Sequence, residues 1–216
     1  MYDFFRRPHL YLVRHGSTDL NAGNCFRSWE NPALDDEGLA SAQEIANYFS
    51  YQKVGPVICS DLQRAMQTAE AVLPFSTCSY PDINPNVRPW GLGSLGGQPK
   101  NAKNMKRLQH FIDNPDEMPE GDNAETLNQF RNRWHEVLRA ALISSCPECP
   151  TVIVGHTSNV TATEELYVEN SEKRPETHDI IVPGGILAVY FDESTGDIEL
   201  VPVLGGVERE AESEAS

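Results

Sequence analysis

The segment HLYLVRHGSTDLN, residues 9–21, carries the strongest structural signal in the chain. Its first five residues, 9–13, form an apolar run, which predicts a short buried strand. Arg14 and His15 follow at once, and then a glycine, Gly16, whose missing side chain lets backbone approach a ligand. Because ligands gather beyond the carboxyl ends of strands in open α/β sheets, this strand end is a candidate ligand site.

Strands and helices alternate along the rest of the sequence. Further apolar runs predict strands at 57–59, 151–154, 186–191 and 198–203. Apolar residues at helical spacing predict helices that start at caps formed by Asp35 or Asp36, by Ser60–Asp61 and by Asn123. The alternation predicts an α/β fold, a three-layer αβα sandwich with a mostly parallel central sheet and helices on both faces.

The domain organisation is simple. Residues 1–207 are predicted to form one α/β domain. Within it, the Pro-, Gly- and Asn-rich stretch 74–120 reads as an irregular insertion over the edge of the sheet that carries the site, with a short helix near 101–112. Residues 208–216 are acidic and small, which predicts a disordered tail.

The composition excludes several classes of function. A formal net charge of −15 argues against nucleic acid and anionic membranes as partners, and no apolar run approaches membrane-spanning length. The start of the chain lacks the features of a secretion signal, and the five cysteines follow no disulfide framework, so we expect a cytoplasmic location. The CxxC pair Cys146 and Cys149 has no second pair to complete a zinc site and is interpreted as a surface loop.

Three polar clusters follow predicted strands, and together they could form a basic pocket that overrides the acidic surface. Arg14 and His15 follow the first strand, Arg64 lies just after the second, and His156 follows the strand at 151–154. The planar fork of arginine suits phosphate oxygens. A histidine nitrogen held in line with phosphorus can act as a nucleophile. The pattern therefore favours a small phosphorylated substrate.

The stretch LVRHGSTDLN, residues 12–21, resembles the RHGxTxxN signature of the histidine phosphatase superfamily, which includes cofactor-independent acid phosphatases and phosphoglycerate mutase-like enzymes. The resemblance covers about residues 9–190, with its motifs in the family's order. The other segments that carry it are 24–29, 34–38, 60–69, 124–127 and 154–157.

This resemblance implies roles for individual residues. His15 would be the phosphorylated nucleophile, with Arg14, Arg64 and His156 clamping the phosphoryl oxygens. The substrate-binding candidates are Asn21, Thr18, Arg27, Arg88 and Thr157. Arg88 is equally compatible with a solvated loop charge. Such enzymes use no metal or other cofactor, because the arginines and the second histidine stabilise the charge that a metal would otherwise take.

The chain departs from the family at the general acid. Many members carry Leu-Arg-Glu before a Gly-rich segment, whereas this sequence has Pro89 where that glutamate would stand. A replacement carboxyl could come from the 115–125 loop, with Glu125 the preferred candidate and Asp122 an alternative. Otherwise the leaving group needs no proton, as in a phosphoanhydride or phosphohistidine.

The sequence is compatible with three functions. The preferred one is a phosphatase that hydrolyses a phosphate monoester of a small metabolite through a phosphohistidine on His15. A phosphoglycerate mutase-like phosphotransferase is the second, because basic residues lie between 88 and 107. The third is a phosphate-binding or phosphohistidine-directed protein with weak esterase activity, which Pro89 keeps open.

Overall fold

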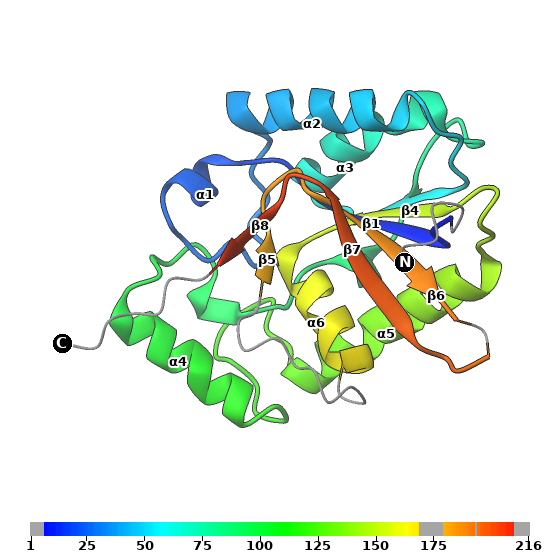
Figure 1. Ribbon diagram of the computed structural model, residues 1–216. Helices are drawn as coiled ribbons and strands as arrows, with labels where there is room; N and C mark the ends of the chain where they lie inside the picture. The colour runs from blue at the N-terminus through cyan, green and yellow to red at the C-terminus, as the bar shows by residue number, and fades with distance from the viewer. Residues whose placement is uncertain (1–6, 169–178, 193, 210–216) are drawn as a thin grey trace.

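A central six-stranded sheet organises the computed structural model, which describes residues 7–168, 179–192 and 194–209 (Figure 1). The strand order is β3-β2-β4-β1-β6-β7. The strands are β1 (Leu10–Arg14), β2 (Val57–Cys59), β3 (Asp82–Ile83), β4 (Thr151–Gly155), β6 (Ile186–Phe191) and β7 (Ile198–Leu204). A separate two-stranded sheet pairs β5 (Asp179–Ile181) with β8 (Val207–Arg209).

The strands in one half of the large sheet pair in parallel, and the strands in the other half pair antiparallel. The β3-β2-β4-β1 half is parallel, with Arg14 opposite Gly155 in the β1–β4 register. β6 runs antiparallel to β1, and β7 antiparallel to β6. The prediction of a mostly parallel sheet that ends in a strand pair is confirmed.

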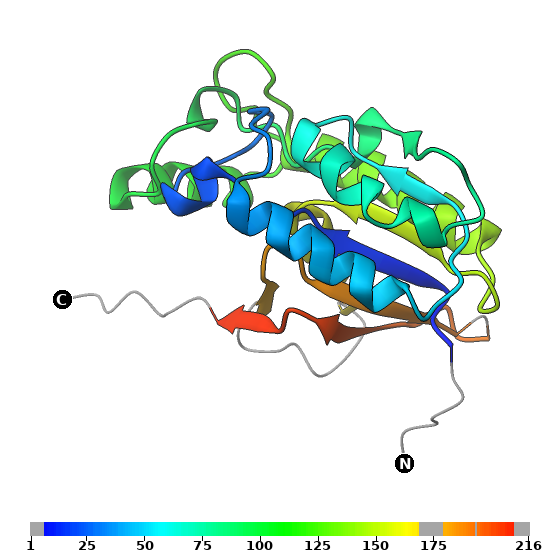
Figure 2. The ribbon, with the colours of Figure 1, turned by 90° about the horizontal axis from the view of Figure 1, so that it is seen from above.

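Helices cover both faces of this sheet (Figures 1 and 2). One face carries α2 (Asp36–Phe49) and α3 (Gln63–Glu70), and the other carries α5 (Leu127–Ser144) and α6 (Thr157–Val168). Side chains of β1 alternate between two separate cores, because successive residues of a strand point to opposite faces. Tyr11 and Val13 pack with the α2–α3 core, while Leu10 and Leu12 pack with the α5 core. The three-layer arrangement is therefore confirmed.

Two of the three predicted helix caps are wrong. Asp35 caps α2 as predicted, accepting a 2.7 Å hydrogen bond from the Gly38 amide. α3, however, has Leu62 at its N-cap, because the Asp61 carboxylate pairs with an arginine instead. α5 begins after Thr126, which forms a capping box with Gln129. Asn123, the predicted cap, lies three residues earlier in the left-handed region with φ 60°.

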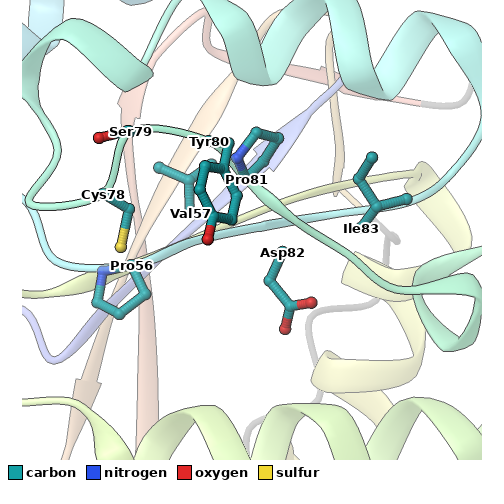
Figure 3. Close-up of a pocket in the computed structure, with 8 residues that line it drawn as sticks. All are labelled: Pro56, Val57, Cys78, Ser79, Tyr80, Pro81, Asp82 and Ile83. Atoms are coloured by element: carbon teal, nitrogen blue, oxygen red, sulfur yellow. The ribbon is translucent and has the colours of Figure 1, made fainter.

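The 74–120 segment is more regular than predicted. Its helix, α4 (Ala102–Asp113), lies where expected, and short 3₁₀ helices cover 73–75, 85–87 and 93–95. Asp82 and Ile83 form the edge strand β3 beside β2, so part of the segment belongs to the sheet. A surface pocket at this edge is lined by residues 56–57 and 78–83 (Figure 3).

The predicted tail starts too early. Glu208 and Arg209 belong to β8, which pairs with β5, so the described chain extends two residues beyond the expected domain boundary at 207. Residues 210–216, the rest of the predicted tail, lie outside the described residues. Among the helices that the structure describes, none combines the length and the apolar character needed to cross a bilayer.

Candidate active site

Two neighbouring parallel strands bring the two predicted histidines together. His15 directly follows β1 and His156 directly follows β4, and the His15 amide donates to the Gly155 carbonyl oxygen at 3.1 Å. The centroids of the two imidazole rings lie 5.1 Å apart. Both histidines are buried. The carboxyl ends of β1 and β4 therefore form one site.

Arg64 links the two rings. It is the second residue of α3 and is fully buried. Its Nε donates to His15 Nε2 at 3.1 Å, and its Nη2 lies 3.4 Å from His156 Nδ1. The other guanidinium contacts go to backbone carbonyl oxygens, those of Ser28 at 3.1 Å and Glu30 at 2.5 Å. The two rings and the two carbonyl oxygens together fix the orientation of the Arg64 guanidinium plane.

Hydrogen bonds fix the tautomers of both rings. His15 Nδ1 lies 2.6 Å from the Gly16 carbonyl oxygen. A carbonyl oxygen only accepts, so Nδ1 carries the proton and Nε2 has the lone pair that accepts from Arg64 Nε. His156 Nδ1 faces the Arg64 donor, which places its proton on Nε2. That buried Nε2 has no hydrogen-bond partner among the described residues, so its N–H group is available to donate to a bound ligand.

Burial and nearby arginines keep both imidazoles neutral. The pKa of His15 lies well below its usual value, first because of burial and then because of the charges of Arg64, Arg27 and Arg14. The pKa of His156 is lowered in the same way by burial and then by Arg64. A neutral His15 has the free electron pair that a nucleophile needs.

The site is also a concentration of positive charge. Burial lowers the pKa of Arg64 to about 9, so its guanidinium is still charged at pH 7. Burial likewise lowers the pKa of Arg27, whose charge acts on both histidines and on Arg64. Arg14 is buried and donates through Nη1 to the Ile181 carbonyl oxygen. The local concentration of basic side chains that the acidic sequence requires is therefore present.

Three of the smaller candidates lie in the segments that follow β1 and β4. Thr18 is fully buried and donates through Oγ1 to Asn21 Oδ1 at 2.8 Å in the loop after β1. Thr157 directly follows His156, and its buried Oγ1 has no hydrogen-bond partner within the described residues. The contact of Thr18, Asn21 and Thr157 with a substrate stays a prediction.

Arg88 has its own partners. Its Nε and Nη2 donate to Asp61 at 2.8 and 2.5 Å, and its guanidinium carbon lies 4.6 Å from the centroid of the Trp29 ring. This pair lowers the pKa of Asp61 and raises that of Arg88. Arg88 is therefore held in an ion pair and is not a freely solvated charge, and its contact with a ligand stays a prediction.

Glu125, the candidate acid, precedes the N-cap of α5 and does not begin the helix. Its Oε1 accepts from the Gly91 amide at 2.9 Å and from Arg133 Nη2 at 2.5 Å. Its Oε2 accepts from Arg133 Nε at 2.9 Å. Arg133 also donates to the Pro89 carbonyl oxygen at 2.8 Å. Glu125 thus lies against the segment where the family's acid would stand, with both oxygens acting as acceptors.

Sequence reasoning missed two residues that hold the site. Arg133 holds the 86–91 segment in place by donating to three of its backbone carbonyl oxygens. These partners lie more than 40 positions from Arg133 in the sequence, so no local sequence pattern indicates them. Asn159 Oδ1 accepts from the His156 amide at 2.9 Å and so fixes the turn after β4. Its spacing of three from His156 is typical of such a turn and could have indicated it.

The fold and the site define a class of protein. Two neutral imidazoles and several guanidiniums at the carboxyl edge of an α/β sheet suit an anion such as a phosphoryl group. Within the described residues, no group of three or more His, Cys, Asp or Glu side chains could hold a metal ion. Residues 10–201 match the model of the histidine phosphatase superfamily (branch 1), and the chain belongs to this family.

Relatives carry the names of mutases. A protein named probable phosphoglycerate mutase GpmB from Yersinia pestis (strain Pestoides F) is 27% identical over 147 residues, which is 65% of this chain. The same relative from Yersinia pseudotuberculosis serotype O:1b (strain IP 31758) matches equally. The match spans 64% of the length of these curated relatives.

Solved structures share the fold. The protein TTHB049 from Thermus thermophilus is 24% identical with a TM-score of 0.64, and the match covers 90% of this chain and 98% of that one. A phosphoglycerate mutase from the same organism gives 0.63 at 24% identity, covering 90% and 97%. The structure named Mycobacterial hydrolase 1 reaches 0.73 at 19% identity, covering 94% and 100%.

Proposed function

We propose that this protein is a phosphatase that transfers the phosphoryl group of a small phosphorylated metabolite to His15 and then to water. The observation that carries the proposal is the pair of buried imidazoles linked by Arg64, with His15 Nε2 as acceptor and His156 Nε2 as a donor without a partner among the described residues. One nitrogen can attack phosphorus while the other binds a phosphoryl oxygen.

The first step forms a phosphohistidine. The lone pair of His15 Nε2 attacks phosphorus and the N–P bond forms. The bond from phosphorus to the leaving oxygen breaks, and the leaving oxygen keeps that electron pair and takes up a proton from water. Arg64 moves its donors from the ring to the phosphoryl oxygens, and Arg14 and His156 stabilise the charge that develops there. The His15 Nδ1–H bond to the Gly16 carbonyl oxygen keeps the ring oriented throughout.

Water completes the reaction. It attacks phosphorus, the N–P bond breaks, and His15 returns to its neutral form with inorganic phosphate as the product. The neutral state of His15 at pH 7 supports this turnover, because a protonated ring has no electron pair for the first step.

The test compares wild type with His15→Ala on p-nitrophenyl phosphate, acetyl phosphate and phosphoglycerate. We expect wild type to release phosphate and the variant to lose about 10⁴-fold or more of this activity, because the nucleophile is gone. A rapid quench of wild type during turnover should trap a phosphoryl group on His15, measured by peptide mass. His110→Ala, at an exposed histidine outside the site, is the matched control. Equal rates for His15→Ala and wild type would rule out the proposal.

A substrate with a good leaving group is the second candidate, namely an acyl phosphate, a phosphoanhydride or a phosphohistidine. Pro89 stands where the family's acid is expected. The neighbouring carboxylates, Asp61 and Glu125, are each held by two hydrogen bonds from an arginine. A carboxylate whose oxygens all accept hydrogen bonds is poorly prepared to donate a proton, which favours Glu125 as a positioning residue.

Glu125→Gln decides between the acid and the positioning role. General acid catalysis is worth about 10²–10⁴-fold for an alkyl leaving group and far less for an activated one. If Glu125 positions the 89–91 segment, kcat/KM falls by the same factor for glycerol phosphate and p-nitrophenyl phosphate. A loss confined to glycerol phosphate would restore Glu125 as the acid.

Mutase activity is supported by the names of the relatives and by the basic stretch at 100–107, which contains three lysines and one arginine. The phosphoglycerate arm of the first test separates the two activities. Isomerised phosphoglycerate without net phosphate release would favour the mutase, whereas inorganic phosphate would favour the hydrolase.

A further inference from the structure

The CxxC sequence at residues 146–149 forms a tight turn between α5 and β4. The Cys149 amide donates to the Cys146 carbonyl oxygen at 3.0 Å, and the two cysteines face each other as an antiparallel bridge. Pro147 occupies the first central position of the turn, where its fixed φ favours this shape in advance. The turn is therefore formed by backbone, with no bond between the sulfurs.

This geometry places the two side chains within reach of each other. Residues directly opposite in an antiparallel bridge project to the same face, with Cβ atoms roughly 4.5–5.5 Å apart. The ends of a four-residue turn lie under about 7 Å apart at Cα, and disulfides span roughly 4.4–6.8 Å at Cα and 3.5–4.5 Å at Cβ. The two ranges overlap at Cα and adjoin at Cβ, so this turn is compatible with a disulfide between its ends.

Contacts on both sides fix the base of this turn. The Ser145 hydroxyl donates to the His9 carbonyl oxygen and accepts from the Thr151 amide at 2.9 Å. The Gly55 amide donates to the Pro150 carbonyl oxygen at 2.9 Å. Because hydrogen bonds anchor both ends of the turn, the two cysteines can approach each other without a shift of β4.

The remaining cysteines are placed differently. Cys59 is fully buried, and burial raises its pKa to about 12, so its thiol is protected and unreactive. Cys25 and Cys78 are half-buried on separate parts of the chain, whereas Cys146 is exposed and Cys149 half-buried in the same turn. We propose that Cys146 and Cys149 form a reversible dithiol–disulfide pair, a site of oxidation by hydroperoxides.

The chemistry balances with a hydroperoxide as oxidant. The thiolate of the more exposed Cys146 attacks one peroxide oxygen, forming an S–O bond and breaking the O–O bond. The thiolate of Cys149 then attacks that sulfur, forming the S–S bond and expelling the oxygen as water. Two thiols lose two electrons and two protons, and hydrogen peroxide is reduced to two molecules of water.

The site is separate from the pocket. The turn lies at the amino end of β4, while His156 follows the carboxyl end of the same strand. Figure 2 shows the α5–β4 connection at the opposite end of the sheet from the part of the chain that carries α4. Oxidation of this pair does not depend on the phosphatase proposal.

The test treats the full chain with a small excess of hydrogen peroxide, then alkylates it under denaturing conditions and maps the peptides by mass. We expect two of the five thiols to escape alkylation, both in the peptide that contains residues 146–149, with the mass loss of two hydrogens. Dithiothreitol should restore both thiols. Cys25→Ser, the matched control, should still lose the same pair.

A variant that lacks one cysteine of the pair shows which thiol is oxidised first. In Cys149→Ser, the oxidised Cys146 has no resolving partner, so dimedone should label it as a sulfenic acid. Thermal melting checks that this surface variant is folded. Five alkylatable thiols after treatment, or a disulfide that includes Cys25 or Cys78 or joins two chains, would overturn the proposal.

Discussion

Arg64 is the residue on which the geometry of the pocket depends most directly. It contacts both imidazoles and two backbone carbonyl oxygens of the 28–30 loop. These contacts point in different directions, and a planar fork with five N–H groups can serve all of them at once. A lysine ammonium in the same place is a point charge that can reach only some of them.

Arg64→Lys should therefore retain the positive charge and lose the geometry. We expect kcat/KM on p-nitrophenyl phosphate to fall about 10²–10³-fold, the size of losing one donor that stabilises developing charge. Steady-state kinetics measure this loss, and a melting curve verifies the fold. Arg139→Lys, on the exposed face of α5, is the control. Retention of wild-type activity by Arg64→Lys would contradict the proposed clamp.

At the scale of elements, the loop after β1 is held by close contact with the first turn of α2. A Cβ added to Gly38 would lie 2.2 Å from the Ser17 carbonyl oxygen, and one added to Gly16 would lie 2.6 Å from the Gly38 carbonyl oxygen. The Ser17 hydroxyl also donates to Asp35 at 2.9 Å. Since Gly16 accepts from the His15 ring, this crossing of loop and helix helps to orient the nucleophile.

Gly38→Ala separates helix propensity from packing. Propensity alone predicts a gain of about 1 kcal/mol for alanine inside a helix. The clash with Ser17 backbone predicts the opposite sign, and we expect a loss of about 2–4 kcal/mol in the free energy of unfolding. Urea titration measures the change, with Glu44→Ala on the exposed face of α2 as control. Increased stability in Gly38→Ala would show that this loop moves freely.

A second junction joins α5 to the 86–91 segment. Arg133 on α5 binds Glu125 and the carbonyl oxygens of that segment, and Arg88 binds Asp61 at the end of β2. Two ion pairs thus hold the chain around Pro89. They fix residues 88–91, which follow the 3₁₀ helix at 85–87 and lie close to the segment after His156, where the Trp90 amide donates to the Ser158 hydroxyl.

The whole molecule combines a strongly negative net charge with a buried cluster of basic side chains. The chain carries a net charge of −15, yet two buried histidines are kept neutral by burial and by neighbouring arginines. Protons bind these histidines more readily in the unfolded state, where the pKa is near 6.5. Their contribution to stability is therefore complete above that pKa and is lost as the pH falls below it.

Stability should decline on mild acidification. Between about pH 6.5 and the lowered folded pKa, each histidine costs about 1.4 kcal/mol per pH unit, and His135, whose pKa is also lowered, acts in the same direction. Urea titrations from pH 7.5 to 5, in phosphate-free buffer with enough salt to screen the surface charge, measure the slope. His156→Gln should show a smaller slope than wild type. A pH-independent unfolding free energy would mean that the rings bind protons equally in the folded and unfolded states, which would contradict their lowered pKa values.

The sequence by itself determined the features that depend on short-range patterns. The apolar runs at 9–13 and 151–154 specify buried strands, and the apolar spacing in 127–142 specifies the inner face of α5. The rule that ligands lie beyond the carboxyl ends of such strands then places His15 and His156 at one edge. The fold class and the place of each histidine at a strand end could be predicted because each follows from neighbours along the chain, whereas their meeting depends on the pairing of β1 with β4.

Tertiary structure alone decided the contacts of the charged side chains around this pocket. Asp61 reads locally as a helix cap, and Glu125 reads as an acid aimed at the site. Arg88, 27 positions from Asp61, and Arg133 on α5 occupy their carboxylates instead. A helix cap or a turn depends on residues a few positions apart. An ion pair depends on which side chains meet once the sheet and its covering helices have packed.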